Sequence, residues 1–203
     1  MKYTSLLLAI MVIIATQIAT AQIASSAHDF SGQGWGTTQI CQPCHTPHKA
    51  TLLSDAPLWN HQLTGATFQL YTSSTLNTTT LTQPDASSKL CLSCHDGTVA
   101  LENFGGATGG THYVTGDALI GTNLSNDHPV SFIYNTALAT ADGELFDPAT
   151  HLTSLGGTIA ADLLIGGKLQ CASCHDAHRG YPNPSLLKIS NTGSAFCLTC
   201  HDK

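Results

Sequence analysis

The chain has few charged residues: Asp, Glu, Lys and Arg make up 10% of its 203 residues, whereas about 25% is usual in globular domains. Its net charge is −6 at pH 7, and its seven Lys and Arg residues form no basic run. Nucleic-acid-binding proteins usually gather such residues into a patch, so this composition argues against nucleic acid as a partner. Copies with so few charges also repel one another weakly, which permits self-association.

Aromatic residues are scarce as well, at 6%, and the apolar share of 42% depends on the first 21 positions. The rest of the chain is rich in Thr, Ser and Gly. Such a composition is too polar for an ordinary apolar core of this size. We therefore expect another group to fill the interior.

The chain has one long apolar run, at its start. Lys2 precedes the apolar residues 6–14, and Ala19-Thr20-Ala21 offers an A-x-A cleavage site. The run is shorter than the about 20 apolar residues that span a bilayer. We therefore expect residues 1–21 to be a cleaved signal peptide rather than a retained anchor, with no membrane span afterwards. The expected destination is the cell surface or the extracellular space, or alternatively the periplasm.

All eight cysteines fall in four copies of one pattern, C-x-x-C-H, the attachment signature of c-type haem. Two thiols at this spacing can bond the two vinyl groups of one porphyrin, and the histidine then supplies the proximal iron ligand. The sequence therefore predicts four covalently bound haem c groups. The attachment residues are Cys41, Cys44, Cys91, Cys94, Cys171, Cys174, Cys197 and Cys200, and the proximal ligands are His45, His95, His175 and His201.

Two other uses of paired cysteines are zinc or iron–sulfur sites and, in an exported chain, disulfide bonds. Neither gives a role to the histidine that follows every second cysteine. The recurrence of that histidine therefore favours haem.

The chain has no methionine beyond Met1 and Met11, which both lie in the expected signal peptide. Methionine is the usual alternative to histidine as the sixth ligand of a haem iron, and it raises the reduction potential. Seven histidines remain after the four proximal ones. This composition favours bis-histidine ligation and low reduction potentials.

Five of these histidines are candidates for the four distal positions. His48 and His178 each follow a proximal histidine by three residues, near the same face of a helical turn, so each is expected to reach a neighbouring haem. His61 lies close to a tryptophan that could pack on a porphyrin, and a proline stiffens the chain after His128. His28 lies near the expected mature N-terminus, where it could ligate its own chain or another copy.

The residues alone do not choose four ligands among these five. The other two histidines, His112 and His151, lie in loops rich in Gly and Thr and are expected to stay unliganded.

The motifs divide into two similar modules. Each begins with C-x-x-C-H-x-x-H, at residues 41–48 and 171–178, and ends with C-x-x-C-H-D, which indicates an internal duplication. We expect residues 22–203 to form a single domain of two dihaem modules, about 28–100 and 165–203, joined by a Gly- and Thr-rich segment. The expected fold is mostly irregular, with few short helices and little β structure, wrapped around four haems whose faces form the core.

Several segments resemble the doubled C-x-x-C-H multihaem c-type cytochromes: residues 40–48 (ICQPCHTPH), 57–61 (PLWNH), 91–100 (CLSCHDGTVA), 125–132 (SNDHPVSF) and 171–178 (CASCHDAH). Within these, the chain is similar to the OmcE-type tetrahaem cytochromes, which polymerise into extracellular filaments. The resemblance implies that every haem is bis-histidine and that the haems stack in a continuous chain. It also implies that one axial histidine, for which we favour His28, binds a haem of the adjoining subunit.

The sequence thus predicts an electron carrier rather than an enzyme, because six-coordinate irons leave no position for a substrate. We expect electrons to hop between haems within a filament, with further copies of the chain and redox proteins or extracellular acceptors as partners. The alternatives are a soluble periplasmic tetrahaem shuttle and a haem reductase with one open iron.

Overall fold

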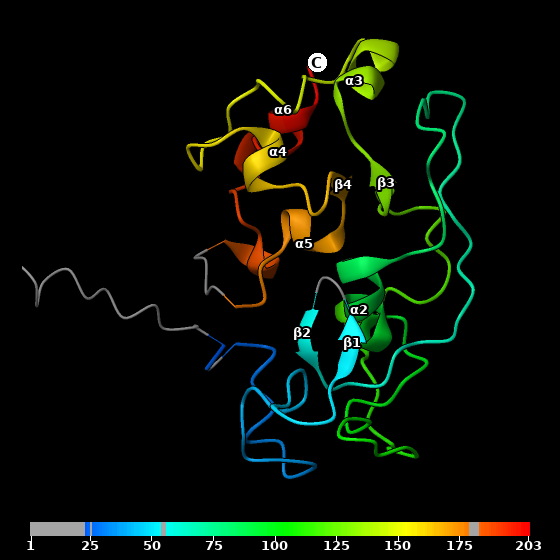
Figure 1. Ribbon diagram of the computed structural model, residues 1–203, viewed down its shortest axis with the longest axis vertical. Coiled ribbons are helices and arrows are strands. Elements are labelled where there is room, and N and C mark those ends of the chain that lie inside the picture. Colours follow the sequence, from blue (N-terminus) through cyan, green and yellow to red (C-terminus); the bar gives the residue numbers. More distant parts are fainter. Residues whose placement is uncertain (1–22, 25, 54–55, 179–182) are drawn as a thin grey trace, which may run out of the picture.

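A computed structural model describes residues 23–24, 26–53, 56–178 and 183–203 (Figure 1). The expected signal peptide, residues 1–21, lies outside the described residues. Among the residues described, no helix is long and apolar enough to cross a membrane.

Regular secondary structure is sparse, so the expectation of a mostly irregular chain with few short helices and little β structure is confirmed. The strands pair as two antiparallel ribbons, β1 with β2 and β3 with β4. In chain order the elements are β1 (Thr51–Leu53), β2 (Ala56–Trp59), α2 (Ala86–His95), η1 (Gly116–Ala118), β3 (Phe132–Ile133), α3 (Thr136–Asp142), α4 (Ile159–Asp162), β4 (Lys168–Leu169), α5 (Cys171–Cys174), η2 (Pro184–Leu186), η3 (Thr192–Ser194) and α6 (Cys197–Cys200).

Each C-x-x-C pair lies in a helical turn. The second pair ends α2, and the third and fourth pairs form α5 and α6. The first pair forms a single turn, in which the amide of His45 donates to the carbonyl of Cys41 at 2.8 Å. Because residues three apart lie on one face of a helix, the turn brings both sulfurs of a motif to the same side.

The C-terminal half contains an apolar core. Its two deepest residues are Ile159, which begins α4, and Leu163, which directly follows it; both are fully buried. The core comprises Phe132, Tyr134, Ala139, Ile159, Leu163, Leu169, Ile189 and Phe196. Most of these residues come from the segment expected only to join the modules. The chain therefore supplies part of its own interior, in addition to any surface that haem provides.

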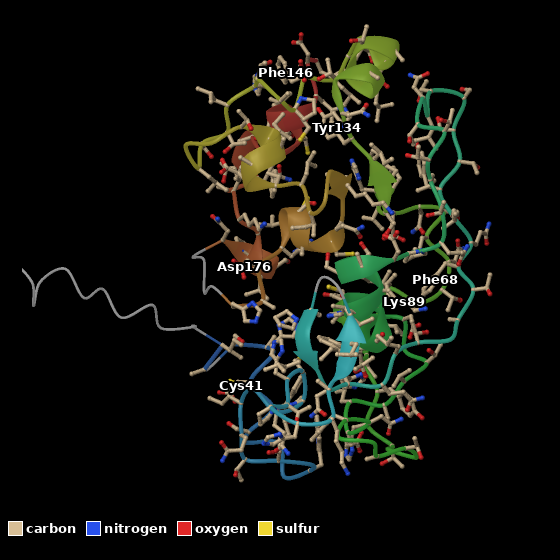
Figure 2. The ribbon with its side chains drawn as sticks, in the orientation of Figure 1. Cys41, Phe68, Lys89, Tyr134, Phe146 and Asp176 are labelled. Atoms are coloured by element: carbon tan, nitrogen blue, oxygen red, sulfur yellow. The ribbon has the colours of Figure 1, made fainter. Side chains whose placement is uncertain are left out.

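Tyr134 ties this core to the fourth motif. Its hydroxyl donates to the carbonyl of Phe146 at 2.6 Å and lies 3.4 Å from the carbonyl of Cys200. Figure 2 shows Tyr134 and Phe146 at the end of the molecule that carries α3 and α6. The C-terminal core thus positions the last haem-attachment motif directly.

The segment between β2 and α2 runs along one side of the molecule (Figure 1). Phe68 packs with Leu92 of α2 and with Leu124, and the side chain of Gln83 bonds both the amide and the carbonyl of Phe68, at 2.7 and 2.9 Å. Residues 76–83 are irregular. Asn77 reaches Asp142 of α3 at 2.9 Å, so this segment braces the two halves against each other.

Candidate functional site

Backbone hydrogen bonds from residues 57–60, a segment that we call the clip, hold the first motif. The amide of Asn60 donates to the carbonyl of Cys44, and the amide of Thr46 donates to the carbonyl of Leu58, both at 2.9 Å. The same segment places the carbonyl of Pro57 3.0 Å from Nδ1 of His45. Since a carbonyl can only accept, Nδ1 of His45 carries the proton and Nε2 is left for a metal.

The third motif has the same clip, built by residues 185–188. The backbone amide of Lys188 donates to the carbonyl of Cys174, and the backbone amide of Asp176 donates to the carbonyl of Leu186, both at 2.9 Å. The carbonyl of Ser185 lies 2.7 Å from Nδ1 of His175. Residues 185–188 thus do for the third motif what residues 57–60 do for the first, as an internal duplication would produce.

The second and fourth motifs use variants of this arrangement. In the second, Nδ1 of His95 lies 2.7 Å from the carbonyl of Ala118, the last residue of η1. In the fourth, the clip segment precedes the motif. The backbone amide of Phe146 donates to the carbonyl of Cys200, and the backbone amide of Asp202 donates to the carbonyl of Glu144, both at 2.9 Å. A hydrogen bond on one ring nitrogen fixes the tautomer and orientation of a metal-binding histidine, and it raises the basicity of the ring.

The clip turns of the first and third motifs contain strained backbone. Leu58, Ser185 and Leu186 have φ of 61°, 57° and 58°, in the left-handed region that non-glycine residues seldom adopt. These conformations aim the Pro57 and Ser185 carbonyls at the proximal imidazoles. Strain of this kind persists where the surroundings enforce it, often at functional sites.

Three proximal histidines each face a candidate distal histidine. The ring centroids of His45 and His178 lie 5.9 Å apart, those of His95 and His28 lie 6.0 Å apart, and those of His201 and His128 lie 6.3 Å apart. Each pair joins positions far apart in the sequence. The fold therefore places three of the five candidates, His178, His28 and His128, opposite proximal histidines.

These separations fit an iron between the two rings. A metal–imidazole bond is about 2 Å long and each nitrogen lies about 1 Å from its ring centre, so imidazoles on opposite sides of one metal have centroids about 6 Å apart. Nδ1 of His28 is buried and has no hydrogen-bond partner among the described residues. Burial, with smaller contributions from His95 and His178, lowers the pKa of this imidazole. The neutral imidazole is the form that binds a metal.

The cysteines also fit covalent haem attachment. All eight are free thiols. Within the part of the chain that the structure describes, no three His, Cys, Asp or Glu side chains converge to hold a metal ion directly. The ligand residues are therefore arranged as facing pairs of imidazoles, each beside a pair of thiols.

The third proximal histidine differs from the others. His175 is exposed, and none of the described residues stacks against its ring. His48, on the first motif, is likewise exposed, and its hydrogen bonds in the structure involve only its backbone. His175 and His48 are thus exposed without facing another imidazole of the described residues, whereas His128 and His178, also exposed, each face a proximal histidine.

His61 is buried beneath the second motif. Its Nδ1 lies 2.9 Å from the carbonyl of Gln62, its Nε2 lies 3.1 Å from the carbonyl of Ala100, and its Nε2 lies 3.6 Å from Sγ of Cys94. Burial lowers the pKa of His61, although its hydrogen bonds to backbone carbonyls act in the opposite direction. A neutral imidazole has one N–H, so only one of the two carbonyl contacts is a hydrogen bond.

The histidines expected to be unliganded have other partners. His112 stacks on Trp35, with centroids 5.4 Å apart, and forms an ion pair with Glu102. His151 stacks on Phe146, with centroids 3.8 Å apart. Neither ring is paired with a proximal histidine in the described residues.

The four motifs adjoin one another in sequence order. Burial, together with the nearby Cys44 thiol, raises the pKa of Cys94 to about 12. Burial and Cys174 likewise raise the pKa of Cys200 to about 12. Between these pairs, the thiols of Cys91 and Cys171 each shift the pKa of the other, and Figure 1 shows α2, α5 and α6 rising through the molecule in that order. The arrangement offers a continuous row of four attachment sites.

Sequence reasoning missed the clip residues, because their role depends on backbone carbonyls that carry no side-chain signature. The positions equivalent to Pro57-Leu-Trp-Asn60 are Ser185-Leu-Leu-Lys188, and they share only one leucine. The repeated C-x-x-C-H-x-x-H was the one available signal that the surroundings of the two motifs would match.

The doubled CXXCH motif family matches residues 165–203, which contain the third and fourth motifs. No curated protein matches the chain. The match agrees with the repeated clip geometry and with the facing imidazoles. The chain therefore has the haem-attachment feature of multihaem c-type cytochromes, a feature that indicates covalently bound haem c and a role in electron transfer.

Proposed function

We propose that this chain is a tetrahaem, bis-histidine c-type cytochrome that carries electrons by haem-to-haem transfer as the subunit of an extracellular filament. One observation carries the proposal. Three proximal histidines each lie opposite a candidate distal histidine, and their ring centroids are separated by the distance that one iron between them requires. Bound haem would supply reversible one-electron chemistry. The protein's residues attach it, fix its two axial imidazoles and keep substrates from the metal.

The proposed ligand pairs are His45 with His178, His95 with His28 and His201 with His128. With both axial positions taken, these three sites are suited to outer-sphere electron transfer and not to binding a substrate. The row of adjoining motifs gives electrons a path along the whole molecule. This arrangement supports a carrier rather than an enzyme.

For the third site we propose that His175 is bound by His48 of an adjoining subunit. Both residues are exposed, and His178, which follows the third motif, already faces His45 of the first motif. If the same relation is repeated between subunits, His48 of the first motif would face the third motif of the next copy. His28, favoured from the sequence for this role, faces His95 of its own chain instead, so we reassign the bridging role to His48.

The exposed His175 also fits two other functions. A water-filled sixth position there would give a haem reductase with one open iron, and ligation by a histidine of the same chain would give a soluble periplasmic shuttle. Export to the cell surface accompanies the filament proposal, and residence in the periplasm accompanies the shuttle.

The test is negative-stain electron microscopy of the haem-loaded protein, with electron paramagnetic resonance to count high-spin irons. We expect filaments from the wild type and from the control His112→Ala, and none from His48→Ala. We expect His28→Ala to keep the filaments while one centre becomes high-spin.

Discrete wild-type monomers with only low-spin haem would replace the filament with the soluble shuttle. Wild-type monomers in which about a quarter of the iron is high-spin would indicate an open third site and a reductase. Filaments that survive His48→Ala would keep the polymer and remove His48 as its bridge.

A further inference from the structure

The second and third motifs meet through a polar cluster, which we call the seam network: Ser88, Ser131, Gln170 and Ser173, which are buried, and Asp85 at its edge, whose side chain is 41% exposed. Ser88, Ser131 and Ser173 have no exposed surface, and Gln170 is 1% exposed. The network lies where α2, which carries the second motif, packs on α5, which carries the third. Buried polar side chains are costly unless they are hydrogen-bonded, so a cluster of them at this junction calls for an explanation.

Gln170 is the centre of the network. Its Oε1 accepts from the amide and hydroxyl of Ser88 and from the hydroxyl of Ser131, which lies 3.1 Å away. Its Nε2 donates to Asp85 at 2.8 Å, and its backbone amide donates to the hydroxyl of Ser173 at 2.9 Å. The side chain of Gln170 thus uses its donor and its acceptor to connect the two helices with the loop before β3.

Ser88 connects this network to the haem-attachment residues. Its hydroxyl accepts a hydrogen bond from the amide of Cys171 at 2.9 Å. Cys91 lies three residues after Ser88, on the same face of α2, and its thiol is close enough to that of Cys171 for each to shift the pKa of the other. One hydroxyl therefore fixes the first cysteine of the third motif against the first cysteine of the second.

The backbone beside the network is strained. Ser131 has φ of 67° and Ala86 has φ of 44°, both in the left-handed region. Three hydrogen bonds hold Ser131 in this conformation. Its hydroxyl donates to Gln170 and accepts from the amide of Asp85, and its own amide donates to the carbonyl of Leu169 at 2.7 Å. Backbone held in this way is found where a precise position is needed, which is a reason to look for a function at the seam.

We propose that the seam network is a positioning device: it sets the spacing and relative orientation of the second and third haems, and through them the rate of electron transfer between the two modules. The inference rests on the proposed function. In that step one electron passes from a ferrous centre of one module to a ferric centre of the other, so one iron is oxidised as the other is reduced, and no bond or proton moves. The rate of such a step falls steeply with distance, so small displacements of the two motifs matter.

Ser88→Ala, compared with Ser87→Ala, tests the proposal. Both serines lie on α2 and both hydroxyls are withdrawn from solvent. The hydroxyl of Ser87 has no hydrogen-bond partner in the part of the chain that the structure describes, whereas that of Ser88 joins Gln170 to Cys171. The readouts on the haem-loaded protein are the Soret circular-dichroism couplet, which reports haem–haem orientation, and the inter-module electron-transfer rate after flash reduction.

We expect Ser88→Ala to change the couplet and to slow the inter-module step about tenfold or more, with Ser87→Ala unchanged in both. Identical couplets and rates in the two variants would overturn the proposal. If Ser88→Ala does not fold, Ser131→Gly serves in its place, because glycine adopts the positive φ freely while losing the hydroxyl. Haem content and the low-spin spectrum of the wild type test the proposed function separately, since both are independent of the seam.

Discussion

The imidazoles of His45 and His178 lie opposite each other, with ring centroids 5.9 Å apart and planes 28° from parallel, although 133 positions separate them in the sequence. His45 belongs to the first module and His178 to the second. An iron between them would therefore take one axial ligand from each module. Under the proposed ligation, neither module would supply all the ligands of the first site, so the two modules would form one unit.

Replacing His178 by alanine should leave the first iron without its distal ligand. We expect about a quarter of the iron to change from low-spin to high-spin, measured by electron paramagnetic resonance and by the Soret band. His151→Ala is the matched control, because His151 stacks on Phe146 and faces no proximal histidine in the described residues. An unchanged spectrum for His178→Ala would rule out the pairing with His45.

Replacing His128 by methionine should raise the reduction potential of one centre, because a thioether ligand favours the ferrous state relative to a second imidazole. Potentiometric titration followed optically should then resolve one centre at higher potential and three centres near their original values. His112→Met, at an exposed position on a different segment, should leave the titration unchanged. A shift of equal size in the control would remove His128 from the ligand set.

Substitutions at Ser185 test whether the clip acts through its backbone conformation or through the side chain of Ser185. Its carbonyl accepts from Nδ1 of His175, and its φ is 57°. Proline cannot adopt that angle, whereas glycine adopts it readily. Ser185→Pro should therefore lose the hydrogen bond, raise the potential of the third centre and destabilise the fold by about 1 to 3 kcal/mol. Ser185→Gly should match the wild type in potentiometry and thermal unfolding, and a similar change in both variants would contradict this explanation.

Glu102 should make the stability depend on pH at the acid end. Partial burial acts to raise its pKa, but hydrogen bonds from His112 and from the backbone amides of Thr111 and His112 outweigh it and lower the pKa from 4.5 to about 2. Because the folded pKa is the lower one, the stabilisation is fully present above pH 4.5 and is lost as pH falls towards 2. Solvent screening limits it to about 1 kcal/mol.

Thermal unfolding of wild type and Glu102→Gln between pH 7 and pH 2 measures this contribution. The wild type should be the more stable at pH 7, and the difference should shrink between pH 4.5 and pH 2. A constant difference across that range would mean that the carboxylate charge of Glu102 does not contribute.

The local features of the chain could be predicted from its sequence. The spacing of Cys171, Cys174 and His175 specifies one helical turn and one attachment site without reference to any other segment. Sparse secondary structure was predicted from a polar, Gly- and Thr-rich chain that carries four haem-attachment motifs. The core around Ile159 and Leu163 was missed, because its residues are scattered through a segment that reads as loop.

The pairing of ligands could not be predicted, because it depends on which distant segments the fold brings together. His28 and His128 have neighbours with nothing in common, yet both face a proximal histidine. His61 lies beside a tryptophan, which made it a good candidate, but its ring is enclosed beneath Cys94 with both nitrogens against carbonyls. Sequence defines which residues are able to bind iron, and the fold decides which of them are free to do so.

The long separation of His45 and His178 gives the molecule an order of assembly. Doubling the length of a loop raises the entropic free energy of closing it by only about 0.6 kcal/mol, so the long separation destabilises the pairing little at equilibrium. Long-range contacts nevertheless form late, because the intervening chain must be arranged first. If His45 and His178 bind one iron, the site at Cys41 and Cys44 would thus be among the last to acquire its full ligand set, and its completion would mark the joining of the two modules.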